Sequence, residues 1–168
     1  MTAHTILDIA DARWLDIFSK RKWIETTRTC SKHVFNEVAW SHYSIVEFVL
    51  SSDEEIQVLN KQYRQKDKPT NVLSFPLLEF SAPTSVVSTL FLSNELLGTV
   101  VLSIETVLKE SVVLDVPVKN RVIHLMVHGV LHLLGYDHEK DSDAIVMESL
   151  EIVILQRLGI PNLYVSVC

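Results

Sequence analysis

Residues 118–138 of the chain read VKNRVIHLMVHGVLHLLGYDH, and this stretch decides the architecture. Pro117 stands just before it, where proline favours the start of a helix, and Asp115 is a candidate acidic cap. Gly135 can adopt the left-handed conformation that ends a helix. The pattern therefore predicts a helix over Val118–Leu134, after which the chain turns back.

Three histidines of this stretch have the spacing of a metal site. His128 and His132 are four residues apart, so a helix stacks them on one face, about 6 Å apart along its axis. Two imidazoles so placed can reach one ion with Zn–N bonds of about 2.0–2.1 Å, and the turn at Gly135 can bring His138 to the same ion. Three neutral nitrogen ligands leave a fourth position for water, the pattern of a catalytic zinc. The sequence predicts one Zn²⁺ per chain.

Other residues of the stretch leave alternatives open. His124 lies four residues before His128, so a His124–His128 pair competes with the triad; the glycine turn favours the triad and leaves His124 to support a ligand or to pack. Asp137 either orients a ligand imidazole or is a turn residue.

Gly129 stands where the zinc-peptidase motif His-Glu-x-x-His-x-x-Gly-x-x-His carries its general base. That disfavours a peptidase of this mechanism, but not a metal hydrolase.

Residues 59–76 read LNKQYRQKDKPTNVLSFP and form a second motif. Arg64 falls near the expected end of a helix, and its planar guanidinium suits phosphate oxygens, which makes it a candidate catalytic residue. Lys61, Lys66 and Lys68 add positive charge, so we expect these cations to line a groove beside the metal. The alternative is a solvated helix end, where cations are favoured by the helix dipole.

Strand and helix patterns alternate along the rest of the chain, which predicts an α+β fold of the α/β-sandwich type: a small mixed β-sheet packed with about five helices in one domain, 1–168. Strands are expected at Thr5–Ile9, Ser44–Leu50, Asn71–Phe75 and Gly98–Leu102. Besides the histidine helix, helices are expected at Asp11–Phe18, Trp23–Trp40, Ser52–Tyr63, Ser103–Leu114 and Asp143–Leu158. The helix at Ser52 is indicated by the capping-box spacing of Ser52 and Glu55. Residues 77–95 have no clear period and are expected to form a long loop or irregular hairpin.

Composition bounds the class of protein. The chain has 168 residues, 48% hydrophobic, with a net charge of −6, which excludes a disordered chain and argues against a strongly basic nucleic-acid-binding domain, though not against a local basic patch. Cys30 and Cys168 do not have the spacing of a disulfide framework or thiolate metal site. The N-terminus lacks a signal-peptide pattern, and apolar runs such as Leu96–Ile104 are too short to span a membrane. We expect a cytoplasmic protein.

Together the two motifs resemble the YbeY family of bacterial ribosomal-RNA maturation endoribonucleases. The resemblance covers about residues 45–160. It rests on residues 128–138, on the Leu59–Pro76 run, and on a closing helix with Met147-Glu148, Glu151, Ile154-Leu155 and Leu158-Gly159.

The resemblance implies a small mixed sheet packed with helices, a zinc ion held by His128, His132 and His138, and a functionally important arginine at Arg64. It also implies single-strand-specific RNA cleavage in 16S ribosomal-RNA 3′-end maturation, ribosome biogenesis and ribosome quality control. Thr99 departs from the family, which commonly has Asp at this position.

The leading hypothesis is therefore a zinc-dependent endoribonuclease. Its expected partners are ribosomal RNA and the small ribosomal subunit, with no membrane and no DNA. One alternative is a non-catalytic, zinc-containing ribosome assembly factor in which Arg64 only binds RNA. Another is a metal hydrolase of a different substrate.

Overall fold

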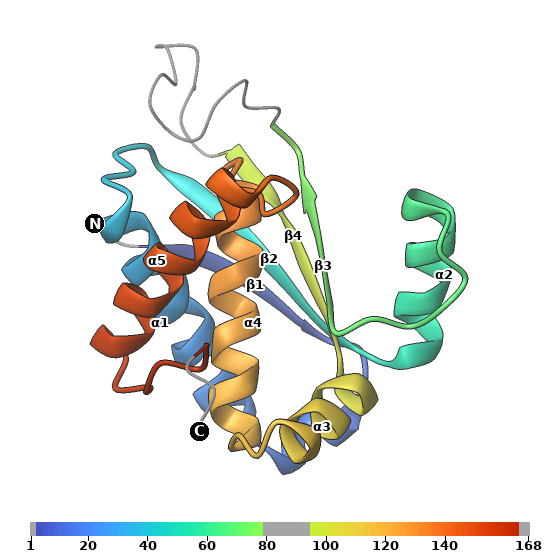
Figure 1. The fold of residues 1–168 in the computed structure, drawn as a ribbon. Helices are drawn as coiled ribbons and strands as arrows, with labels where there is room; N and C mark the ends of the chain where they lie inside the picture. The colour runs from blue at the N-terminus through green and yellow to red at the C-terminus, as the bar shows by residue number, and fades with distance from the viewer. Residues whose placement is uncertain (1–2, 79–94, 165–168) are drawn as a thin grey trace.

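The sheet has four strands and a mixed topology. The computed structural model describes residues 3–78 and 95–164. The strand order is β1-β2-β4-β3, in which β1, β2 and β4 run parallel and β3 is an antiparallel edge strand (Figure 1). The strands are β1 (His4–Ile9), β2 (Ser44–Ser51), β3 (Val72–Pro76) and β4 (Glu95–Ser103).

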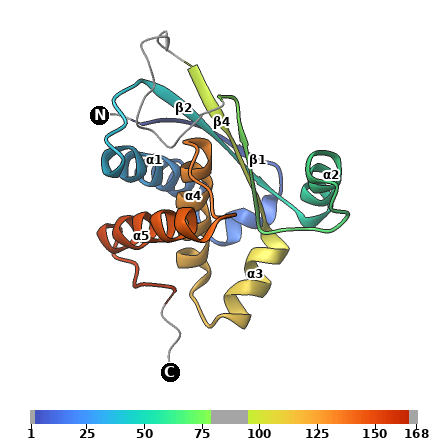
Figure 2. The same ribbon diagram turned by 45° about the horizontal axis from the view of Figure 1, so that its top comes forward.

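The helices divide unequally between the two faces of the sheet. Three of them, α1, α4 and α5, lie on one face, with α4 between the sheet and α5, while α2 lies on the other side beside β3 (Figures 1 and 2). The predicted α+β fold with a small mixed sheet and about five helices is confirmed. The α-helices are α1 (Lys20–Glu37), α2 (Asp53–Arg64), α3 (Ile104–Val113), α4 (Val118–Leu133) and α5 (Asp141–Arg157).

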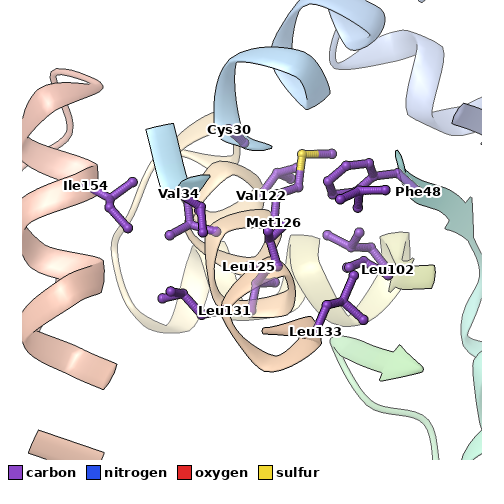
Figure 3. Close-up of a cluster of buried hydrophobic side chains, with 14 of the residues drawn as sticks. Cys30, Val34, Phe48, Leu102, Val122, Leu125, Met126, Leu131, Leu133 and Ile154 are labelled. Atoms are coloured by element: carbon purple, nitrogen blue, oxygen red, sulfur yellow. The ribbon is translucent and has the colours of Figure 1, made fainter. Parts of the chain in front are cut away.

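The main core lies between α4 and the sheet. Alternate residues of β2, Val46, Phe48 and Leu50, are fully buried, as a strand with one covered face requires. Figure 3 shows Phe48 pointing toward Met126 and Val122 of α4. This packing fixes α4 against the sheet and so fixes where its histidines lie.

Two predicted helices differ from those observed. Asp11–Phe18 forms only a 3-10 helix, η1 (Ala12–Asp16), whose Trp14 is buried and donates its indole N–H to the Ser51 carbonyl, 2.8 Å away. The long helix predicted over Trp23–Trp40 is displaced toward the N-terminus and ends at Glu37. Trp40 is buried beyond its end, where its indole N–H donates to the Ser44 hydroxyl.

Of the predicted helix caps, Ser52 is confirmed, Ser103 is confirmed in position only, and Asp115 is wrong. Ser52 caps α2 by accepting from the Glu55 N–H. Ser103 holds the N-cap position of α3, but its hydroxyl contacts the Asp53 carboxylate instead of a helix N–H. Asp115 has a positive φ of 52° in the turn after α3, and Pro117 takes the N-cap position of α4.

Some expectations concern residues that the structure does not describe. Most of the predicted 77–95 loop, namely residues 79–94, lies outside the described part, as does Cys168. Cys30 is described as a buried free thiol, and burial raises its pKa to about 12. No helix within residues 3–78 and 95–164 has both the length and the apolar character needed to cross a bilayer.

Candidate metal centre

Helix α4 and the turn after it build the centre. The rings of His128 and His132 lie one turn apart on α4, with their Nε2 atoms separated by 3.0 Å. Gly135 takes a φ of 85°, donates its N–H to the His132 carbonyl, and is followed by Tyr136, which donates to Leu131. These two bonds form a Schellman motif, the glycine-dependent helix end that the sequence predicted.

The loop after the glycine brings in His138. Its ring centroid is 5.3 Å from that of His128 and 5.0 Å from that of His132, and one ligand nitrogen from each residue lies within 4.8 Å of the others. Two nitrogens bound tetrahedrally with bonds of about 2.0–2.1 Å lie about 3.4 Å apart, so only small side-chain movements separate this cluster from a coordinated one. A neutral donor set of three imidazoles fits a zinc ion.

The structure places Asp137 and His124 next to the triad but not among its ligand atoms. Asp137 accepts the N–H of His138 at 2.7 Å, which is the turn role of the two that the sequence allowed. His124 is buried and lies outside the cluster of three ligand atoms. The triad, and not the His124–His128 pair, is therefore the group that could hold a metal.

Packing against the sheet explains why Gly129 stands where the zinc-peptidase motif has a glutamate. Gly129 faces the sheet, and a Cβ atom there would lie 2.5 Å from a Val100 methyl carbon and 3.2 Å from the Ser74 hydroxyl oxygen. The Ser74 hydroxyl also donates to the Gly129 carbonyl at 3.1 Å. A glutamate side chain does not fit between α4 and the sheet, so this centre lacks that base for a steric reason.

Arg64 lines the same pocket as the triad. The pocket has a volume of about 640 Å³ and includes all three histidines, Arg64, β3 residues and the loop through Glu139. Arg64 is the last residue of α2 and is exposed. The structure thus brings together the four site residues that the sequence singled out.

The expected lysine-lined groove is wrong. Lys61 pairs with Asp67, with 2.7 Å between Nζ and a carboxylate oxygen. Lys66 and Lys68 are exposed, and neither lines the pocket. Among the described cations of this motif, only Arg64 faces the metal centre.

A buried carboxylate lies behind the triad, and the sequence indicated its place in the closing helix but not its part in the site. Glu151 of α5 is fully buried and accepts from His128 Nδ1 at 2.5 Å. Burial alone raises the pKa of this carboxyl, but hydrogen bonds from His124 and His128 outweigh burial and hold the pKa at about 2. A signal was present: Glu151 lies four residues after Met147 and three before Ile154, within the apolar stripe of its helix.

The centre also favours a neutral imidazole at His132. Burial, together with the charges of His128 and His138, lowers the pKa of His132 to about 4, against the opposing effects of Asp137 and the Tyr136 backbone. A metal ligand must be deprotonated, and His132 meets this condition at neutral pH.

Comparisons with known proteins identify the family. The family model described as Endoribonuclease YbeY matches residues 8–159. The chain belongs to the YbeY family. A relative from Ehrlichia canis named Endoribonuclease YbeY is 36% identical over 154 residues, which cover 87% of this chain and 93% of the relative. Another of the same name from Magnetococcus marinus is 47% identical over 120 residues, covering 71% and 82%.

A solved structure shares the fold of this YbeY chain. The solution structure of TM1509 from Thermotoga maritima superposes with a TM-score of 0.56 at 22% identity, covering 92% of this chain and 88% of that protein. At this identity the likeness concerns the fold alone.

Thr99 of the YbeY chain lies beside a carboxylate. Thr99 of β4 pairs in register with Glu47 of β2 and donates its hydroxyl to the Glu47 carboxylate at 2.7 Å. Thr99 and Arg64 also line a second, larger groove of about 1000 Å³, between α2 and the sheet face that α4 does not cover. Arg64 therefore stands where the two grooves meet.

Proposed function

We propose that this chain is a zinc-dependent endoribonuclease that cleaves single-stranded RNA in 16S ribosomal-RNA 3′-end maturation, and so serves ribosome biogenesis and quality control. One observation carries the proposal: the three histidines and Arg64 line one pocket of about 640 Å³. Membership of a family described as endoribonucleases supports RNA as the substrate.

The proposal gives each residue a role. His128, His132 and His138 hold one Zn²⁺, which when bound supplies Lewis-acid polarisation of a phosphoryl oxygen or lowers the pKa of a water molecule. Arg64 binds the scissile phosphate through its planar fork and stabilises charge that develops on the phosphate oxygens. Gly129 carries no side chain, so no glutamate is assigned to proton abstraction there.

The proposed cellular context follows from the substrate. We infer that the small ribosomal subunit is the partner, that the protein acts in the cytoplasm where ribosomes mature, and that residues 1–168 act as one domain. A net charge of −6 weakens general attraction to nucleic acid. Recognition should therefore depend on the pocket and on a docked ribosomal particle, without DNA or membrane binding.

Cleavage of matched substrates tests the proposal. Purified protein, freed of contaminating ribonuclease, is incubated with labelled single-stranded RNA, duplex RNA and single-stranded DNA of one sequence. We expect cleavage of single-stranded RNA only, abolished by a chelator and restored by zinc. Zinc and RNA binding without cleavage would instead support the assembly factor. Cleavage of a different ester with no effect on RNA would support another metal hydrolase.

A further inference from the structure

A chain of buried and half-buried polar contacts runs from α3 to the metal centre. Glu110 of α3 accepts two guanidinium N–H bonds from Arg121, at 3.0 and 2.8 Å. Arg121 Nη1 lies 3.1 Å from His124 Nδ1, and His124 Nε2 lies 3.1 Å from Glu151. The other Glu151 oxygen meets His128. Five side chains from three helices thus connect end to end.

The first contact determines the tautomer of His124. A guanidinium is always protonated and can only donate hydrogen bonds. Nδ1 of His124 therefore accepts from Arg121, and a neutral His124 carries its proton on Nε2. That N–H points at a Glu151 oxygen. The direction of the bond is set by Arg121, whose side chain is 13% exposed.

The second contact determines the tautomer of His128. Glu151 has only acceptor atoms when ionised, and its two oxygens face His124 Nε2, His128 Nδ1 and the Tyr164 hydroxyl. All three groups therefore donate to it. Because His128 places its proton on Nδ1, its Nε2 keeps a lone pair. That Nε2 is the atom that faces His132 in the metal centre.

We propose that Glu151 is a positioning residue that holds His128 in the tautomer needed for metal binding, and that Arg121 secures Glu151 in this role through His124. The proposal rests on the proposed metal site, but not on RNA cleavage. Carboxylates that orient a ligand imidazole commonly change metal affinity by 10–100-fold when they are removed. Here Glu151 orients His128, and Arg121 in turn orients Glu151 through His124.

Nitrogen-15 NMR of the metal-free, histidine-labelled protein tests the proposal without any substitution. Long-range spectra distinguish the two neutral tautomers, and His124→Gln and His128→Gln spectra assign the signals. We expect wild-type His128 with its proton on Nδ1 and His124 with its proton on Nε2. Finding the His128 proton on Nε2 overturns the proposal, whatever the protein does to RNA.

Zinc affinity of Glu151→Gln gives the second arm. Glutamine keeps the size of the side chain but replaces one acceptor oxygen by an N–H donor, so His124 or His128 must face a donor. Competition with a chelating dye should give a zinc Kd that rises about 10–100-fold. The matched control is Glu37→Gln, because Glu37 is a half-buried glutamate paired with Arg157, away from the centre; it should leave the Kd unchanged. An unchanged Kd in Glu151→Gln overturns the proposal.

Arg121→Met tests the outer part of the chain. Methionine keeps an unbranched side chain but cannot donate to His124. Glu151 still favours the Nε2–H form of His124, but without Arg121 a measurable share of His124 should carry its proton on Nδ1, and the zinc Kd should rise by less than in Glu151→Gln. A His124 signal that stays wholly in the Nε2–H form in this variant would remove Arg121 from the proposal.

Discussion

The two sides of the metal pocket are built differently. The histidine side belongs to the buried interior, since His128 contacts the fully buried Glu151 and its helix packs on the sheet. The Arg64 side is the exposed end of α2, which is anchored by a small separate cluster of Ile56, Leu73 and Val101. The proposed metal binding is therefore coupled to the core, whereas the proposed phosphate binding depends on a peripheral helix. Substitutions on the two sides should have separable effects.

Removing a ligand should have the largest effect. His128→Ala, His132→Ala and His138→Ala should each lose bound zinc and RNA cleavage together, because two imidazoles and water make a much weaker site than three. His124→Ala should still purify with about one zinc per chain, and His33→Ala on α1 is a neutral control. Metal analysis of the purified variants decides this. Stoichiometric zinc in His138→Ala would contradict the ligand set.

Arg64 should affect the chemistry without affecting the fold. Arg64→Ala should slow single-turnover RNA cleavage by about 10²–10³, typical for loss of one preorganised charge stabiliser, while zinc content and melting temperature stay near wild type. Arg64→Lys keeps the charge but loses the fork, so its rate should lie between the two. Lys66→Ala, an exposed cation that does not line the pocket, is the matched control. A large fall in melting temperature would show a structural role instead.

Gly129 lets α4 of the histidine side pack closely on the sheet. Gly129→Ala should destabilise the protein by about 1–3 kcal/mol, typical of an overpacked core, because its Cβ would lie 2.5 Å from Val100. Val100→Ala removes the clashing methyl carbons, so the double variant should lose less stability than the two single losses combined. Denaturant unfolding of the four proteins checks this. Additive losses would mean that the contact does not limit the approach of α4 to β4.

Acid should lower the free energy of unfolding of the metal-free protein, by less than the preceding substitution does. The folded protein lowers the pKa of His132 from 6.5 to about 4, chiefly through burial. Between these pH values the unfolded chain binds the proton more readily, so stability falls as the pH drops from 6.5 toward 4. Unfolding of metal-free wild type and His132→Asn from pH 7 to pH 4 should show a steeper decline in the wild type. Parallel curves would rule out this contribution from His132.

The sequence predicted the local parts of the site better than its long-range parts. His128, His132 and the turn at Gly135 depend on helical geometry within a few residues, so spacing alone located them. Glu151 and Arg121 act through tertiary contacts between α3, α4 and α5, which spacing along the chain does not reveal.

Competing partners explain the errors. Ser103 bonds Asp53 from another helix instead of capping its own. Lys61 forms a salt bridge with Asp67, so the positive charge of this motif does not form a basic groove. In both cases the sequence correctly indicated a residue that forms polar contacts, but the tertiary structure determined which partner it contacts.

Single-turnover cleavage measured during a zinc titration tests the central claim, that one pocket joins the metal and Arg64 in a single reaction. Metal-free wild type and Arg64→Ala receive zinc in steps and are assayed on the same single-stranded RNA. We predict that the wild-type rate rises linearly and levels off at one zinc per chain, and that Arg64→Ala follows the same curve about 10²–10³ lower. Wild-type cleavage that is independent of zinc, or equal rates for the two proteins, would contradict the account.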